Sequence, residues 1–262
     1  MDMKLTTWLW ALLATAYAFV LLEFTEQITF FVPNGYHQTT SRFILALTFG
    51  LVIWRYLPSA LARLKARPSR TRLAISAFII IIIIVQVYGG NGLPDVSFRR
   101  FLFLIFATKC IGFSEEFLSR GVIFALFEKH SIWLAVAVSS ISFGAMHYMG
   151  FYEGADFGRV TWRVIGAASA GVLFAGLMLF TGSLWVPIVF HSLYNLPFLE
   201  GQEGTSVVVE SPATREYIMA IATSSLSQVA LGLLLAYYSA HEPLRLKRVL
   251  LKFKLIEEPH ER

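Results

Sequence analysis

Long apolar runs recur along the chain and restrict what it can fold into. About 20 consecutive apolar residues suffice for a helix to span a bilayer, and backbone polar groups in lipid must be satisfied within helices or closed barrels. Hydrophobic residues make up 56% of the chain and charged residues 15%, whereas a soluble domain carries about 25% charged residues. The sequence therefore predicts an all-α, polytopic membrane protein with about eight transmembrane helices, over residues 6–31, 43–62, 73–90, 100–127, 131–149, 164–181, 184–199 and 216–239.

The chain is predicted to form a single integral membrane domain, 1–262, because no stretch is polar enough to fold separately. The first apolar run continues past the small residues at 14–16, so an uncleaved first span is expected. The last segment, 241–262, interleaves basic and apolar residues. This pattern is typical of a basic amphipathic helix on an anionic cytoplasmic leaflet.

The basic residues indicate an orientation. Cytoplasmic loops of membrane proteins carry an excess of Lys and Arg. In an eight-span chain, 12 basic residues fall at the end of span two, in the loop after it and in the C-terminal tail, and six fall on the opposite side: Arg42, Arg99, Arg100, Arg159, Arg163 and Arg215. We therefore expect both termini to be cytoplasmic, in a multi-pass protein of a bacterial-type inner or plasma membrane. The net charge of +5 reflects this topology, so no nucleic-acid partner is expected.

One predicted span contains two adjacent carboxylates. The run F-S-E-E-F-L-S-R at 113–120 lies between apolar segments, where a charge near the centre of a helix costs from about 3 to over 10 kcal/mol. Glu116 and Arg120 are four residues apart and can pair on one helical face. Glu115 is rotated by about 100° from Glu116 and has no obvious local partner. Glu115 is therefore the candidate reactive carboxylate.

Two further predicted spans contain histidine, which is less favourable inside a membrane than an apolar residue. Phe143 and His147 are four residues apart, as are His191 and Asn195, so each pair shares one helical face. Pro187, four residues before His191, is predicted to bend its helix and leave room for a cavity. A carboxylate, two imidazoles and an amide can activate a water molecule and stabilise an oxyanion.

The three motifs also carry a resemblance. E-E-x-x-x-R at 115–120, F-x-x-x-H at 143–147 and H-x-x-x-N at 191–195 resemble the CAAX protease and bacteriocin-processing (CPBP) family of glutamate-dependent intramembrane endopeptidases, which includes the eukaryotic Ras-converting CAAX endopeptidase. The resemblance covers a catalytic core at about 100–199 and implies an active site inside the helix bundle.

The resemblance also implies roles for individual residues. Glu115 would activate water, His147 would help to hold that water, and His191 and Asn195 would face the substrate carbonyl. The residues expected to brace the site are Glu116, Arg120 and Phe143. No metal or other cofactor is implied. The expected partners are the lipid bilayer and a membrane protein or lipidated peptide as substrate, reaching the site laterally or from the cytoplasmic side.

Other readings of these residues stay open. Glu115, His147 and His191 could form a zinc site. Cys110, His147 and Arg120 could serve a cysteine transpeptidase. The protein could also be a catalytically silent membrane scaffold or regulator with the same fold. A transporter or proton relay would also use intramembrane Glu and His, but its paired inverted repeats are not evident in the sequence.

Overall fold

A computed structural model of the chain describes residues 5–24, 36–88, 97–148, 156–196 and 214–252. Within these ranges the regular structure is helical, with no strand, as the apolar runs predict. The helices are α1 (Leu5–Glu23), α3 (His37–Tyr56), α4 (Pro58–Lys65), α5 (Arg70–Tyr88), α6 (Phe98–Glu116), α7 (Phe124–Glu128), α8 (Ile132–Ala145), α10 (Phe157–Thr181), α11 (Trp185–Asn195) and α12 (Arg215–Lys252), with a π-helix η1 (Phe117–Ile123) and a 3-10 helix η2 (Met146–Tyr148).

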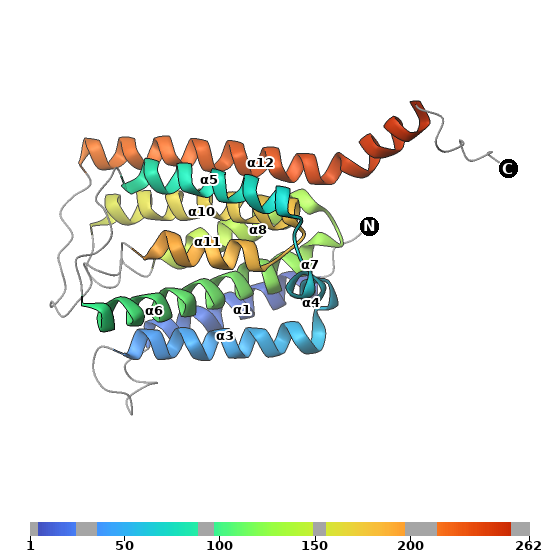
Figure 1. Cartoon of the computed structure of the whole chain (residues 1–262). Coiled ribbons are helices and arrows are strands. Elements are labelled where there is room, and N and C mark those ends of the chain that lie inside the picture. The colour runs from blue at the N-terminus through green and yellow to red at the C-terminus, as the bar shows by residue number, and fades with distance from the viewer. Residues whose placement is uncertain (1–4, 25–35, 89–96, 149–155, 197–213, 253–262) are drawn as a thin grey trace.

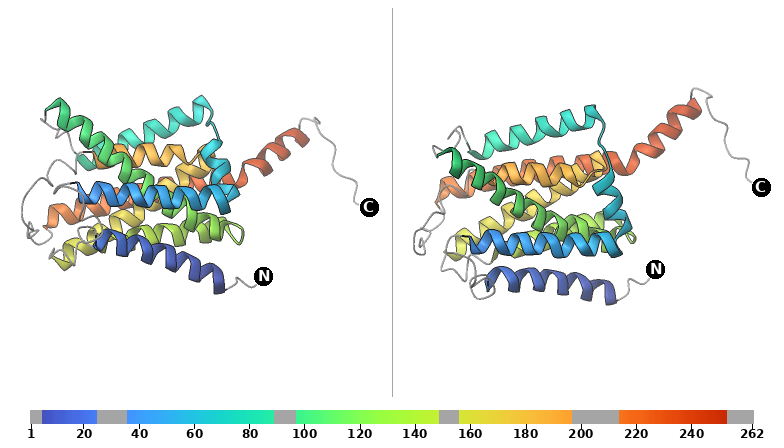
Figure 2. Two further views of the ribbon diagram at one scale, coloured as in Figure 1. Left: turned by 90° about the horizontal axis from the view of Figure 1, so that it is seen from below. Right: turned by 60° about the horizontal axis from the view of Figure 1, so that its bottom comes forward.

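The long helices run back and forth between the two ends of one bundle (Figure 1). Helix α1 begins at the same end at which α3 finishes, α5 begins, α10 finishes and α12 projects outward (Figures 1 and 2). Each of the eight predicted spans therefore overlaps a helical segment. The predicted amphipathic tail falls partly on the end of α12, and residues 253–262 lie outside the described ranges.

The number of membrane spans is not confirmed. In the described ranges, three helical segments are long and apolar enough to cross a membrane: Leu5–Leu22, Phe157–Thr181 and Arg215–His241. The pair α3 and α4 makes a fourth if its two helices count as one span. Helices α6 and α11, which carry Glu115 and His191, do not meet this requirement for a membrane span. Helix α6 contains several charged residues, and α11 has only 11 residues.

Two proline positions explain differences from the predicted spans. The span predicted at 43–62 is bent by 108° between α3 and α4, because Pro58 lacks an N–H and disfavours helical geometry at Leu57. Pro187 was predicted to bend span seven, but it is the third residue of α11. The first four N–H groups of a helix have no partner within it, so Pro187 is tolerated there. It marks the start of α11.

Close helix contacts hold the bundle around the site. A Cβ on Gly112 of α6 would lie 2.4 Å from the hydroxyl oxygen of Ser192 on α11, and one on Gly171 of α10 would lie 2.9 Å from the Cα of Ser140 on α8. Two clusters of buried apolar side chains fill the rest of the bundle, and α10 and α11 contribute to both. Small residues therefore set the spacing of the helices that carry the polar motifs.

Candidate active site

A π-helix follows the two adjacent carboxylates. Glu115 and Glu116 are the last residues of α6, and η1 continues directly from them. The N–H of Phe124 donates to the carbonyl oxygen of Ser119, five residues earlier. This is the hydrogen bond of a π-turn, which occurs frequently at functional sites. No sequence motif indicated this change of helix type.

Glu116 and Arg120 form a buried ion pair, as their spacing predicts. The Arg120 Nη1 lies 3.2 Å from the Glu116 Oε1, and both side chains are fully buried. The Arg120 Nη2 donates to the carbonyl oxygen of Gly171, 2.8 Å away on α10. The guanidinium also lies over the rings of Phe143 and Phe174, at 4.7 and 5.7 Å from their centroids. Arg120 therefore ties η1 to α8 and α10.

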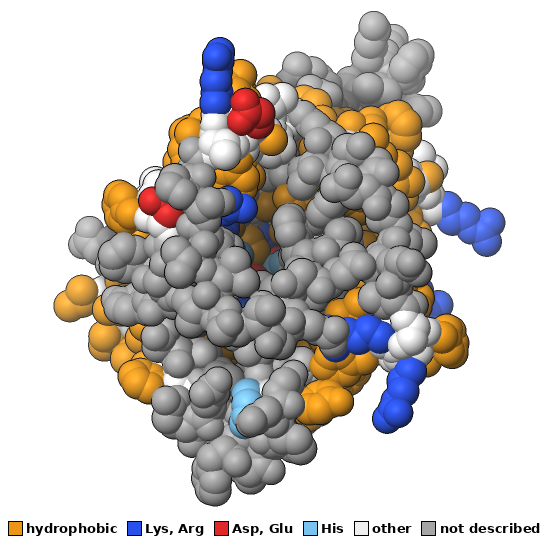
Figure 3. Space-filling view, turned by 90° about the vertical axis from the view of Figure 1, so that its left-hand side faces the viewer, with side chains coloured by type: hydrophobic (Ala, Val, Ile, Leu, Met, Phe, Trp, Pro, Cys, Tyr) orange, Lys and Arg blue, Asp and Glu red, His pale blue; other side chains and the backbone are white. Residues whose placement is uncertain are grey.

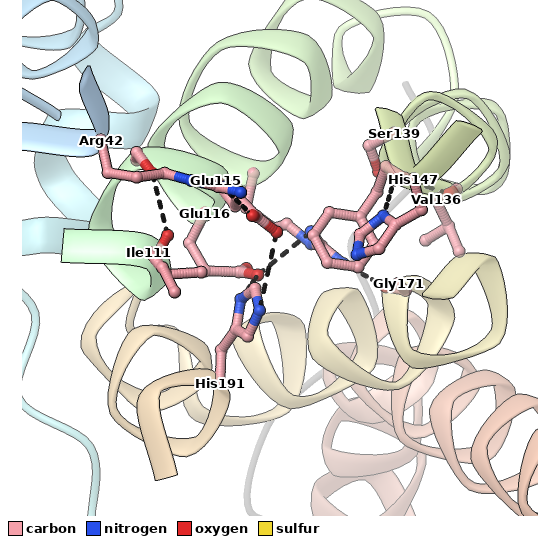
Figure 4. A network of polar contacts seen from close by, with 12 residues as sticks. Arg42, Ile111, Glu115, Glu116, Val136, Ser139, His147, Gly171 and His191 are labelled. Carbon is pink, nitrogen blue, oxygen red and sulfur yellow. Dashed lines mark hydrogen bonds and ion pairs between the residues drawn. The ribbon is translucent and has the colours of Figure 1, made fainter. Parts of the chain in front are cut away.

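His191 joins the two carboxylates from α11. Its Nδ1 lies 2.9 Å from the Glu116 Oε1, where a ring N–H donates to the carboxylate, and its Nε2 lies 3.7 Å from the Glu115 Oε2 (Figure 4). The ring stacks on Phe174, with centroids 5.2 Å apart. When Nδ1 carries the proton of a neutral ring, Nε2 is an acceptor. Glu116 thus fixes which ring nitrogen faces Glu115.

Glu115 has a partner that the sequence did not reveal. Its Oε1 forms an ion pair with the Arg42 Nη1 from α3 (Figure 4). Arg42 precedes the predicted span 43–62, but in the structure α3 begins at His37 and includes it. The lack of a partner within the helix was correctly read from the spacing. The sequence shows an arginine directly before a long apolar run at this position. It gives no indication of the partner, because Glu115 lies 73 residues away.

His147 and Arg42 lie on opposite sides of the carboxylates (Figure 4). The polar cluster between them consists of Glu115, Glu116, Arg120 and His191, together with Arg42. His147 belongs to η2 and is half-buried. Its Nδ1 lies 3.0 Å from the carbonyl oxygen of Phe143, to which an N–H donates, and the two rings lie 5.2 Å apart. Glu115 interacts electrostatically with His147. Among the described residues, however, no ion pair or hydrogen bond joins the two. The structure thus brings Glu115, Glu116 and His191 into direct contact, with His147 nearby.

Asn195 and Cys110 lie outside the contacts of this cluster. Asn195 is the last residue of α11, four residues after His191, and is half-buried. It makes no hydrogen bond to any other described residue of the cluster. Cys110 is a free, buried thiol on α6. Because Arg120 is already bound to Glu116, it is not a free partner for chemistry at Cys110.

The end of the bundle away from the start of α1 is hollowed. Figure 3 views this end and shows acidic, basic and histidine side chains at the floor of the hollow. Three side chains of the cluster retain some exposure: Arg42 is 19% exposed, Glu115 8% and His191 4%. These three side chains are therefore not completely closed off from the outside of the bundle.

The described residues include no preformed metal site. In the part of the chain that the structure describes, no group of three or more His, Cys, Asp and Glu side chains is arranged to hold a metal ion. Glu115, His147 and His191, the zinc ligands considered from the sequence, are not gathered in that way.

Comparison with known proteins identifies the segment that carries this site. Residues 97–197 match the family model described as type II CAAX prenyl endopeptidase Rce1-like. The match confirms the resemblance predicted from the three motifs and spans all of them. The Rce1-like family is a protease family, and together with the apolar helices the match indicates a membrane protein. Neither the search of curated proteins nor that of solved structures gave a match. Arg42, on α3, lies outside the Rce1-like segment.

Proposed function

We propose that the protein is an intramembrane endopeptidase that hydrolyses a peptide bond of a membrane-associated or lipidated substrate. One observation carries the proposal. In the Rce1-like segment, the Glu115 Oε2 is buried, has no hydrogen-bond partner among the described residues, and lies 3.7 Å from the His191 Nε2. A buried, unsatisfied carboxylate oxygen is costly, and a water molecule at this position would satisfy it.

The proposed reaction begins with that water. Glu115 takes one proton from the water as the new C–O bond forms at the scissile carbonyl carbon. Asn195 donates a hydrogen bond to the resulting oxyanion, while His147 and the Nε2 of His191 hold the water in line. Glu115 then returns the proton to the leaving amine as the C–N bond breaks. Water is thereby divided between the new carboxylate and the new amine.

The surrounding charges suit this role. Glu115 and Glu116 carry two negative charges, and Arg42 and Arg120 carry two positive charges within ion-pair distance. Buried charges are tolerated when they are paired and hydrogen-bonded. Arg120 and His191 both contact the Glu116 Oε1. The Glu116 Oε2, like the Glu115 Oε2, has no hydrogen-bond partner among the described residues, but Glu116 is fully buried whereas Glu115 keeps some exposure. Glu115 is therefore the carboxylate that a water molecule and a substrate can reach.

We also propose that substrate reaches Glu115 from the hollowed end. With the termini in the cytoplasm, as the basic residues indicate, that end faces the opposite side of the membrane. This differs from the sequence expectation of lateral or cytoplasmic access. Reporter fusions at the C-terminus and in the loop between α5 and α6 would test the orientation, and a cytoplasmic reading from the loop would refute it.

The enzymatic proposal is tested with purified protein in detergent. We would incubate it with internally quenched peptides that carry a farnesylated cysteine before an aliphatic C-terminal tripeptide, with unlipidated versions beside them, in ¹⁸O-labelled water. Hydrolysis places one ¹⁸O atom in the new carboxylate. General-base catalysis contributes about 10²–10⁴-fold, so Glu115→Gln should lose at least 100-fold in rate. Product yields at background level from both the parent and Glu115→Gln would favour a silent scaffold, equal measurable rates would refute Glu115 as the base, and an aminolysis product without ¹⁸O would favour a transpeptidase.

A further inference from the structure

Arg42 distinguishes the two oxygens of Glu115. Its Nη1 pairs with Oε1, whereas Oε2 faces the His191 Nε2 and has no hydrogen-bond partner among the described residues. A free carboxylate can accept hydrogen bonds on either oxygen. In this site one oxygen is held by a guanidinium, and the other is left for a water molecule.

Arg42 reaches Glu115 from a helix that is fixed against the site. Helix α3 packs on η1, where a Cβ on Gly121 would lie 2.3 Å from the Ile53 Cδ1. Ser41, next to Arg42, is fully buried, so the turn of α3 that carries Arg42 packs against the bundle. The guanidinium is planar and always charged, and it presents its donors in a rigid fork. The contact that the structure shows is made by one nitrogen of this fork, from Nη1 to the Glu115 Oε1, and the rigid plane lets Arg42 hold that oxygen in place as well as neutralise the carboxylate.

We propose that Arg42 is a positioning residue for catalysis: it binds the Glu115 Oε1 and thereby presents the Oε2 as the oxygen that takes the proton from water. This inference rests on the proposed function, and it adds a residue from outside the Rce1-like segment to the reaction. Two arginines then brace the acid pair from different elements, Arg120 at Glu116 and Arg42 at Glu115. His191 lies between the two carboxylates.

Orientation of the Glu115 carboxylate by Arg42 can be distinguished from neutralisation of its charge. If Arg42 only neutralised Glu115, a lysine would replace it fully. If it orients the carboxylate, Arg42→Lys loses the fork and the rate falls although the charge remains. A misplacement of about 1 Å in an active site can cost about 100-fold in rate. We therefore expect kcat to fall about tenfold in Arg42→Lys and about 100-fold in Arg42→Ala, with KM changed less than about threefold.

The test uses the full-length protein in detergent and a quenched farnesylated peptide that the parent cleaves. Arg42→Ala, Arg42→Lys and the control Arg55→Ala are compared by kcat, KM and thermal unfolding. Arg55 lies on α3 as well, but it is exposed near the far end of that helix, and its replacement should leave kcat unchanged. Added guanidinium chloride at low millimolar concentration should restore part of the activity of Arg42→Ala, whereas the same concentration of sodium chloride should not.

The outcomes separate this inference from the proposed function. Loss of activity in Glu115→Gln with full activity in Arg42→Ala would overturn the role of Arg42 and leave the endopeptidase in place. Full activity in Glu115→Gln would overturn the endopeptidase mechanism itself. If Arg42→Ala does not fold, Arg42→Lys decides the question: a folded Arg42→Lys protein with the kcat of the parent refutes positioning by the guanidinium fork.

Discussion

Replacing Glu116 with Gln should destabilise the bundle strongly. Glu116 is the ion-pair partner of Arg120, and both side chains are fully buried. The guanidinium would keep its bond to the carbonyl of Gly171 and its position over Phe143 and Phe174, but it would lose its counter-charge. Removing one partner of a buried ion pair costs about 3–5 kcal/mol. This is a large fraction of the total stability of a typical protein, about 5–15 kcal/mol.

A double-mutant cycle would show that the loss arises from the unpaired charge. Glu116→Gln, Glu116→Leu, Arg120→Met and the double variant Glu116→Leu/Arg120→Met would be unfolded by denaturant in detergent micelles and followed by tryptophan fluorescence; the last three and the parent form the cycle. Replacing both charges with apolar groups of similar volume is often neutral or stabilising, so the double variant should be more stable than Glu116→Gln. Arg55→Ala, at an exposed position of α3, should change stability by less than about 0.5 kcal/mol. A loss below about 1 kcal/mol in Glu116→Gln would refute the reasoning.

Three further predictions concern packing, the thiol and metal ions. A Cβ on Gly176 of α10 would lie 2.3 Å from the carbonyl oxygen of Gly232 on α12, whereas one on Gly166, also on α10, would lie 3.4 Å from Ile221. Gly176→Ala should therefore lower the free energy of unfolding by about 1–3 kcal/mol. Gly166→Ala is the control in the same unfolding assay. Cys110→Ser should retain the cleavage rate of the parent, and a loss above about 100-fold without unfolding would revive the cysteine mechanism. Treatment with a zinc chelator should leave peptide cleavage unchanged, and a loss restored by Zn²⁺ would favour the metal mechanism.

The features that could be predicted from the sequence depend on local spacing. Apolar runs indicated the helices, and the four-residue separation of Glu116 and Arg120 indicated their ion pair, because neighbours on one helical turn meet whatever the rest of the chain does. The break between α3 and α4 was also readable, since Pro58 stands inside the predicted span. The prediction passed over this break because hydropathy alone does not detect it.

The features that were missed depend on how distant helices pack. The contact between Arg42 and Glu115 joins residues 73 positions apart, and it forms only because α3 packs beside α6 and η1. The stacking of His191 on Phe174 has the same origin. The π-helix at 117–123 is a departure from regular helix geometry, and its residues are compatible with an ordinary α-helix. The site residues were thus found as separate motifs, while their mutual arrangement required the fold.

The π-helix has a consequence for how this chain can change length. A π-turn holds one residue more than the α-turn it replaces, so deleting one residue within 117–123 would convert the segment to α-helix. The helix after the deletion would keep its orientation relative to α6, whereas one residue deleted from a purely α-helical segment turns everything after it by about 100°. Phe124 and Phe127, both fully buried on α7, would therefore stay in the core, while side chains within the segment, such as Arg120, would shift. The π-helix is thus a place where the chain can lose one residue and still keep α6 and α7 in their places, at the expense of the contacts made between them.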